Sequence, residues 1–207
     1  MMKERLQKIA SMSNRQSSTN WYVVTGGPGS GKTTTINILA GRNYHVTVEH
    51  ARHYIDTQRI GGKSVSKIRS NQREFQQKVL AMQLEQERSM SPADTVFLDR
   101  AVPDSLAYYR FMGLEPDEKL MNALKTVSYK KVFILDILPL VNDYARSEDA
   151  EAQKRIHQLL IDVYSSLPFP VVQVPVMPPE ERVDFILKNI SSDEGGHEIK
   201  SQDNIPQ

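Results

Sequence analysis

The sequence predicts an α/β fold in which a five-stranded parallel sheet carries helices on both faces. Five short segments are apolar and rich in β-branched or aromatic residues, as buried strands are, and segments of helical periodicity separate them. This alternation requires right-handed crossovers and therefore parallel strands. A glycine-rich turn also stands directly between the first strand and the first helix. The expected strands are 21–25, 45–48, 95–98, 131–135 and 171–174.

The expected helices begin or end at residues that favour helix termini. Asp104 is expected to cap a helix that ends at Gly113, and Pro116 is expected to open the next helix, which continues to about Val127. Pro179 leads into the last helix. The other helices are expected at about 34–41, 67–90 and 150–166.

The composition predicts one domain, over 21–190, between a loosely ordered arm at 1–20 and a disordered polar tail at 191–207. The formal net charge of +1 argues against nucleic acid and anionic membranes as partners. The absence of cysteine excludes disulfides, thiol catalysis and cysteine-ligated zinc. No apolar run approaches the roughly 18 residues of a membrane helix, and no signal-peptide pattern is present. These features predict a cytoplasmic protein and leave its oligomeric state open.

Residues 26–33 read Gly-Gly-Pro-Gly-Ser-Gly-Lys-Thr and match the phosphate-binding pattern G-x-x-x-x-G-K-[ST]. Glycines let backbone N–H groups turn inward, and the helix that follows adds positive potential at its N-terminus. We expect Lys32 to be a solvent-facing charge that reaches the β- and γ-phosphates, and the Thr33 hydroxyl to bind Mg²⁺. The residues expected to bind ATP are Gly26, Gly27, Pro28, Gly29, Ser30, Gly31, Lys32, Thr33 and Thr34.

Asp99 follows the third expected strand and has the form of a Walker B residue, whose carboxylate would hold Mg²⁺ directly or through water. Asp136 follows the fourth strand in the same way. We prefer Asp99 because its neighbour Arg100 adds a phosphate-binding group suited to a kinase. A motor ATPase would usually place a glutamate where Arg100 stands. The alternative for Asp99 is a strand-end residue that only caps a turn.

Glu49 follows the second expected strand, so its carboxylate should emerge near the γ-phosphate and could take the proton of an acceptor hydroxyl. Arg52 could anchor the same acceptor and keep Glu49 ionised. The alternatives are a capping glutamate without chemistry and, for the six basic residues of 50–73, a solvated helix face. No N-K-x-D motif for guanine recognition is present, which argues against a regulatory GTPase.

Several motifs carry a resemblance to a known family: residues 23–33, Glu49 to Arg52, Leu98-Asp99-Arg100 with Asp104, and 143–148, followed by 174–176 and 179–183. In this order they resemble the AAA-type P-loop domain family. That family includes domains similar to the ribosylnicotinamide kinase domain of bacterial NAD regulators. The chain is more distantly similar to thymidylate and deoxyribonucleoside kinases, which implies the strand order 2-3-1-4-5. The resemblance implies an NTP-binding core and phosphotransfer, and it does not identify the acceptor.

Kinases of this class resemble one another in having a mobile lid that carries an arginine. Arg146 lies after the fourth expected strand, and the resemblance implies that it closes over the γ-phosphate and stabilises the charge of the phosphoryl group during transfer. The alternative is a solvated arginine paired with Glu148 or Asp149. The prolines at 175–179 are expected either to flank the base or to form a plain turn. The expected catalytic residues are Lys32, Glu49, Asp99 and Arg146; Glu49, Arg52 and Arg100 would bind the acceptor, and Thr33 and Asp99 the metal.

The sequence therefore predicts an ATP- and Mg²⁺-dependent kinase of a small metabolite that resembles a nucleoside or nucleotide. One other function left open is an NTP-binding or NTP-hydrolysing switch that acts on a partner protein. A second is a polynucleotide 5′-hydroxyl kinase, which would need a basic channel lined with aromatic residues. Only the kinases should consume ATP much faster with their acceptor present than without it.

Overall fold

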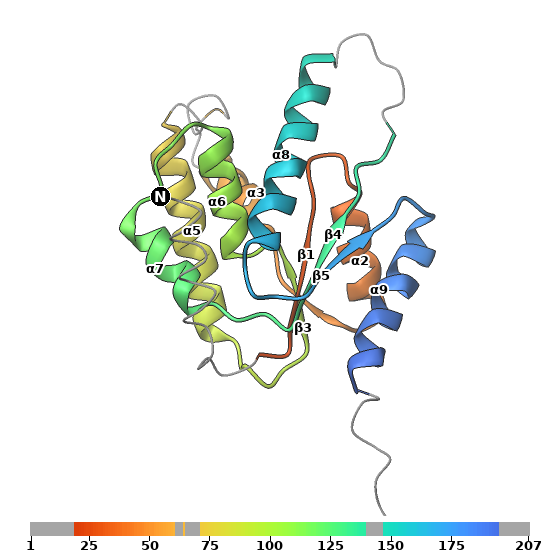
Figure 1. Ribbon diagram of the computed structural model, residues 1–207. Helices are drawn as coiled ribbons and strands as arrows, with labels where there is room; N and C mark the ends of the chain where they lie inside the picture. Colours follow the sequence, from red (N-terminus) through yellow and green to blue (C-terminus); the bar gives the residue numbers. More distant parts are fainter. Residues whose placement is uncertain (1–18, 61–63, 65–70, 140–146, 195–207) are drawn as a thin grey trace, which may run out of the picture.

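Five parallel strands form one sheet at the centre of the computed structural model, which describes residues 19–60, 64, 71–139 and 147–194 (Figure 1). The strand order is β2-β3-β1-β4-β5, which confirms the predicted order. The central strand pairs with its neighbours so that Val24 lies opposite Asp99 and Phe133. The strands are β1 (Trp21–Thr25), β2 (His45–Val46), β3 (Val96–Asp99), β4 (Lys131–Leu135) and β5 (Val171–Val174).

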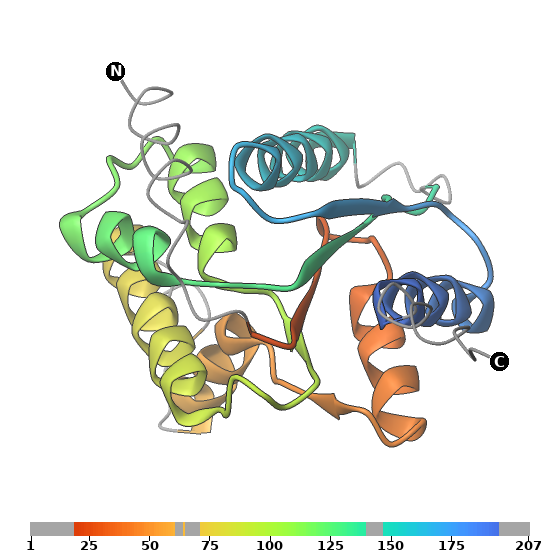
Figure 2. The same cartoon turned by 60° about the horizontal axis from the view of Figure 1, so that its bottom comes forward.

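Helices cover both faces of the sheet, as predicted (Figure 2). Two of them, α2 and α9, lie side by side on one face. The other face is covered by α5, α6, α7 and α8, and α3 packs against α5. The helices are α2 (Lys32–Gly41), α3 (His50–Ile60), α5 (Gln72–Ser89), α6 (Val102–Phe111), α7 (Glu118–Thr126), α8 (Ser147–Ser165) and α9 (Pro179–Glu194).

The alternation of side chains along β1 divides the apolar core into two clusters, one on each face of the sheet. Trp21 and Val23 belong to the cluster with α5 to α8, whereas Tyr22 and Val24 belong to the cluster with α2 and α9. All residues of β1, β3 and β4 are buried, which is why these strands read as continuous apolar runs rather than alternating ones.

The second strand is shorter than predicted, because it ends at Val46 instead of residue 48. Thr47 still donates its N–H to the carbonyl of Phe97 at 2.9 Å, and its hydroxyl accepts a hydrogen bond from the N–H of Asp99 at 2.9 Å. Val48 is exposed. The chain therefore leaves the sheet edge just before Glu49, and Thr47 joins this turn to the end of β3.

The helix expected from residue 67 begins at Gln72, where the Asn71 side chain accepts a hydrogen bond from the N–H of Glu74 at 3.2 Å. Residues 65–70 lie outside the described part of the chain, as does the expected N-terminal arm except for Thr19 and Asn20. Helix α3 covers the first half of the basic stretch 50–73, for which a solvated helix face was the stated alternative.

Two predicted helix starts are wrong. The cap of α6 is Ala101, and Asp104 lies inside the first turn, where its Oδ2 accepts a hydrogen bond from the N–H of Ala101 at 3.1 Å. Helix α7 begins at Glu118 and is capped by Asp117 rather than opened by Pro116. The last helix continues to Glu194, past the expected start of the tail, and 195–207 lie outside the described residues.

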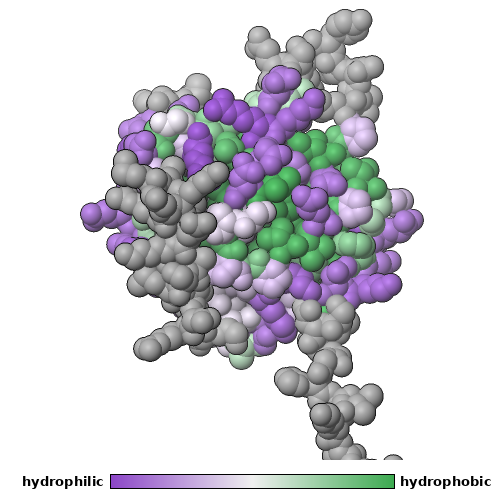
Figure 3. Space-filling view, viewed as in Figure 1, coloured by the Kyte–Doolittle hydropathy of each residue, from purple (hydrophilic) through white to green (hydrophobic). Residues whose placement is uncertain are grey.

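Within the described residues, no helix has the length and apolar character needed to cross a bilayer. The space-filling view shows apolar surface between α8 and α9, where the edge strand β5 runs (Figure 3). Val171 and Val172 of this strand are half-buried, because β5 has a neighbour on one side only.

Glu87 is a buried carboxyl group near the end of α5. Glu87 accepts hydrogen bonds from the Gln83 amide at 3.0 Å and from the Tyr129 hydroxyl at 2.9 Å. Burial raises the pKa of Glu87 to about 7, even though these hydrogen bonds favour the charged form. The folded protein therefore keeps a proton on Glu87 in a pH range where the unfolded chain has lost it.

Stability is expected to fall as the pH rises from 4.5, the ordinary pKa of this group, to about 7, and to level off above that. The loss from this one group is about 3 kcal/mol at most. Glu87→Gln mimics the protonated acid, so urea unfolding should show a more stable protein at pH 8 and little change at pH 5. Glu85→Gln, at an exposed position of the same helix, is the control. An equal change of stability at both pH values would contradict the raised pKa of Glu87.

Candidate active site

The glycine-rich turn between β1 and α2 is held in a shape that side chains would disturb. Gly29 and Gly31 have left-handed backbone angles, with φ of 76° and 78°. A Cβ on Gly26 would lie 2.7 Å from the carbonyl oxygen of Leu135 and from the Ser30 hydroxyl. No side chain caps the N-terminus of α2 at Gly31. The backbone N–H groups there can bind an anion, so the turn fits the phosphates of a nucleotide.

Two side chains from the C-terminal half of the chain support this turn. The N–H of Gly27 donates to Nδ1 of His157 at 3.4 Å, and burial lowers the pKa of His157, so the acceptor nitrogen is unprotonated. On the other side, the Arg182 guanidinium donates to the carbonyl of Ser30 at 2.5 Å and to that of Pro175 at 3.2 Å. Arg182 thereby joins the phosphate-binding turn to the loop after β5.

Lys32 lies inside the site rather than facing solvent, which corrects the prediction. Its side chain is only 6% exposed, and its Nζ donates to Oδ1 of Asp99 at 2.6 Å. Oε2 of Glu49 is 3.7 Å from the same nitrogen. Two carboxylates thus compensate the lysine charge. Burial raises the pKa of Asp99, and the Lys32 ammonium opposes this effect only in part.

Arg100 connects Glu49 to the interior of the protein. It has a left-handed backbone with φ of 68°, a conformation that costs on the order of 1–3 kcal/mol for a residue other than glycine. Its guanidinium donates to Oε1 of Glu49 and to Oδ1 of Asp104, both at 3.0 Å, and lies 5.4 Å from the ring centroid of Tyr108. Several ionic contacts therefore hold a strained residue at the end of β3.

Asp104 anchors this arrangement through four hydrogen bonds. Besides Arg100 and the N–H of Ala101, the Thr25 hydroxyl and the Tyr164 hydroxyl each donate to it at 2.6 Å. Thr25 ends β1 just before the phosphate-binding turn, and Tyr164 belongs to α8. One buried carboxylate therefore links β1, α6 and α8 behind the site.

The charges around Glu49 keep it ionised. Burial alone would raise the pKa of Glu49, but the charges of Arg100 and Lys32, with a smaller contribution from Arg52, outweigh it and lower the pKa. The pKa of Arg100 is raised although burial opposes its charge, because Tyr108 and the carboxylates of Asp104 and Glu49 outweigh that effect. Glu49 is thus a carboxylate that can accept a hydrogen bond.

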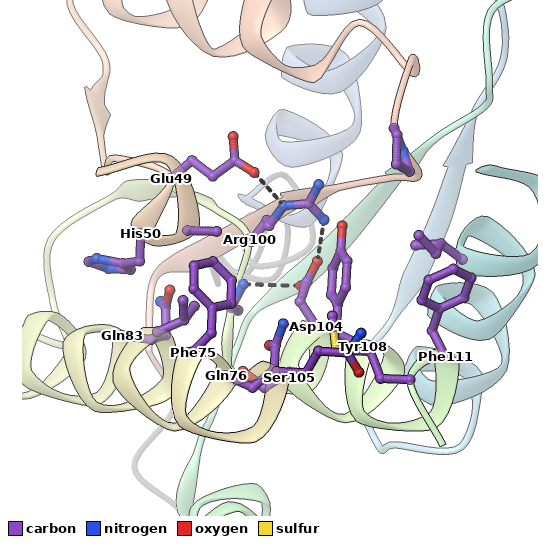
Figure 4. Close-up of a pocket in the computed structure, with 17 residues that line it drawn as sticks. Glu49, His50, Phe75, Gln76, Gln83, Arg100, Asp104, Ser105, Tyr108 and Phe111 are labelled. Carbon is purple, nitrogen blue, oxygen red and sulfur yellow. Dashed lines mark hydrogen bonds and ion pairs between the residues drawn. The ribbon is translucent and has the colours of Figure 1, made fainter. Parts of the chain in front are cut away.

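A cavity of about 390 Å³ opens beside Glu49 and Arg100, between α3, α5 and α6 (Figure 4). Its size lies near the lower end of the range for small-molecule sites. In the close-up, Glu49 and Arg100 lie at one side and Gln76 and Ser105 at the other, with the rings of Phe75 and Tyr108 between them. Its other lining residues include Gln83, Phe111, Met112 and Ile156.

The oxygen groups near Lys32 fit Mg²⁺ held largely by phosphates and water. Among the described residues, no group of three or more His, Asp or Glu side chains forms a metal cluster. Mg²⁺ prefers oxygen ligands and usually keeps several waters beside one or two protein groups. Thr33 is exposed in the first turn of α2 and Asp99 ends β3, so each can supply one oxygen.

Two other predicted residues, Arg52 and Thr34, do not line the cavity. Arg52 is exposed on α3, and Thr34 is exposed on α2. Asp136 lies 3.9 Å from Nε2 of His157, at the end of β4. Arg146 lies outside the described residues.

Sequence analysis missed several residues that shape the site: Gln76, Gln83, Tyr108, His157 and Arg182. One signal was present in the sequence, because Gln76 and Gln83 are seven residues apart and so share a face of α5 with Phe75 and Val79. Polar residues on an apolar helix face point to a cavity. The contacts of His157 and Arg182 had no local signal.

The sheet order and the P-loop define the class of the fold: a P-loop NTPase fold built on a five-stranded parallel sheet. The AAA domain model matches residues 21–182, and the chain belongs to this family. No curated protein matches the chain.

Solved structures of kinases share this fold at low sequence identity. Thymidylate kinase from Ehrlichia chaffeensis is 16% identical with a TM-score of 0.59, over 84% of this chain and 100% of that chain. Deoxyadenosine kinase from M. mycoides is 15% identical with a TM-score of 0.56, over 84% and 99%. The NadR protein in complex with NR is 17% identical with a TM-score of 0.59, over 90% of this chain and 53% of that chain.

Removal of Lys32 should destabilise the protein, because it leaves the buried Asp99 without its cation. We expect Lys32→Ala to lower the free energy of unfolding by about 1–3 kcal/mol. Lys32→Ala combined with Asp99→Asn should recover part of this loss, since the unpaired charge is gone. Urea unfolding measures both, with Lys78→Ala at an exposed position of α5 as control. If Lys32→Ala alone were as stable as the unaltered protein, the Lys32 ammonium would not be needed to stabilise the buried Asp99 carboxylate.

Proposed function

We propose that this protein is a kinase that transfers the γ-phosphoryl group of Mg-ATP to the hydroxyl of a small molecule similar to a nucleoside or nucleotide. The position of Glu49 carries this proposal. One of its carboxylate oxygens lies 3.7 Å from Nζ of Lys32, the other accepts a hydrogen bond from Arg100, and the residue lines the cavity. A carboxylate between a phosphate-binding lysine and a cavity is suited to activate a bound hydroxyl.

The phosphates of ATP would bind at residues 26–34, with Lys32 at the β- and γ-phosphates. Thr33, and Asp99 directly or through water, would hold Mg²⁺, which neutralises phosphate charge when bound. The loop at 175–179, which Arg182 joins to the turn, would flank the base. Arg146 remains the proposed lid arginine.

Glu49 would act as the base of the transfer. The acceptor hydroxyl gives its proton to the Glu49 carboxylate, and its oxygen forms a bond to the γ-phosphorus. The bond between that phosphorus and the bridging oxygen breaks, and ADP leaves. Arg100 keeps Glu49 oriented and ionised, and Arg52 would add positive charge near the acceptor.

The two other functions have less support. A hydrolytic switch gives no role to a cavity lined by Glu49, the residue whose carboxylate also lies 3.7 Å from Nζ of Lys32. A polynucleotide kinase needs a channel for a chain, whereas a cavity of about 390 Å³ holds one small molecule. Phosphorus NMR with Mg-ATP and pooled nucleosides, nucleotides and vitamins tests the proposal, because it detects both transfer and simple hydrolysis. Hydrolysis at the same rate with and without every acceptor would contradict a kinase.

Glu49→Gln should abolish most of the transfer and spare nucleotide binding. The amide keeps the shape of the side chain but cannot take the proton, so we expect phosphorylation of the acceptor to fall on the order of a hundredfold or more. Single-turnover kinetics measures the transfer, and calorimetric titration with ATP measures binding. Glu118→Gln, at an exposed position of α7, is the control. An unchanged transfer rate would remove Glu49 from the mechanism.

A further inference from the structure

We infer that the cavity beside Glu49 binds an uncharged nucleoside, a flat ring system joined to a sugar with a primary hydroxyl, and excludes its 5′-monophosphate. This inference rests on the proposed kinase function and names the acceptor for the same site. Three observations carry it: the charge of the lining, the aromatic walls and two polar side chains that make no hydrogen bond to another described residue.

The described lining carries net negative charge. Two carboxylates, Glu49 and Asp104, and one guanidinium, Arg100, are its charged groups. Burial lowers the pKa of His50, which is therefore neutral. Arg100 is already bound by both carboxylates at 3.0 Å, so no free cation among the described lining residues remains for a phosphate. A phosphate monoester has about −1.5 to −2 charges at pH 7 and would meet carboxylates instead.

The walls of the cavity suit a flat, uncharged ring. Phe75, Tyr108 and Phe111 supply aromatic faces, and Val79 and Met112 supply further apolar surface. Base–aromatic stacking contributes on the order of 1–3 kcal/mol per base in nucleic-acid sites and needs no charge. Arg100 already lies over the ring of Tyr108, which fixes the orientation of that ring.

Two polar side chains at the end opposite Glu49 lack partners within the described chain. Gln76 is only 4% exposed and Ser105 only 5%, both line the cavity, and neither side chain makes a hydrogen bond to another described residue. Their polar atoms are not sealed from the cavity, so a ligand bound there can reach them. They are the groups that could pair with the polar edge of a heterocycle, while the primary hydroxyl lies at Glu49 (Figure 4).

The test compares nucleosides with their own 5′-monophosphates as acceptors of phosphate from Mg-ATP, using the full chain. We expect at least one nucleoside to raise ADP formation and its monophosphate to leave ADP formation at the basal rate. The melting temperature should rise with the same nucleoside and not with the monophosphate. Preference for a monophosphate, or transfer only to acceptors that are not nucleosides, would overturn this inference and leave the kinase function intact.

A nucleoside that binds but is not phosphorylated distinguishes the assignment of the cavity from the proposed kinase function. A nucleoside that raises the melting temperature without being phosphorylated would support the cavity assignment and contradict the kinase function. Neither binding nor transfer with any compound would contradict both.

Gln76→Leu tests the recognition residue itself. The expected result is a KM for the active nucleoside at least tenfold higher, with the KM for ATP unchanged, because one hydrogen bond to the ring is lost. The variant should fold, since leucine is an apolar group of similar size and the Gln76 amide makes no hydrogen bond to another described residue. Gln77→Leu, at the adjacent exposed position on α5, is the matched control. Equal KM values for the two variants would show that Gln76 does not contact the acceptor.

Discussion

Arg100 is a largely buried cation held between two carboxylates, with 13% of its side chain exposed, and the geometry of the candidate site depends on it. It follows β3 in a left-handed conformation and joins Glu49, which ends the turn after β2, to Asp104 on α6. Loss of either carboxylate would leave part of the Arg100 charge uncompensated in a largely buried position, which costs more than the loss of an exposed ion pair. The ionic contacts therefore fix three separate segments at one edge of the sheet.

The same contacts join the two halves of the proposed reaction. Asp104 accepts from Thr25, next to the phosphate-binding turn, and Arg100 orients the Glu49 carboxylate, which also faces Lys32. Hydrogen bonds and ion pairs in this way connect the lining of the cavity to Thr25 and Lys32, the residues that flank the phosphate-binding turn. The cost of left-handed backbone at Arg100 is consistent with a residue placed for function rather than for stability.

Much of the fold could be predicted because its signals are local. The strands at 21–25, 131–135 and 171–174 match the structure residue for residue, since buried parallel strands read as apolar runs. The P-loop was equally clear, because its glycines and lysine are consecutive. Helix starts were less predictable: Asp104 looked like a cap, but its carboxylate faces inward to Arg100 and Tyr164. An aspartate at the start of a helix can either cap the helix or accept hydrogen bonds in the interior, and the local sequence does not distinguish the two roles.

The sequence by itself determined the parallel sheet and the phosphate-binding turn, and the resemblance of its motifs to P-loop kinases implied the strand order. It also identified Glu49, Asp99 and Arg100 as residues that follow strand ends, and parallel topology brings such residues to one edge. Only the tertiary structure decided that Lys32 is buried against Asp99, that Arg182 and His157 support the turn, and that Gln76 faces a cavity. These features depend on contacts between residues tens to more than a hundred positions apart, which leave no periodic pattern in the chain.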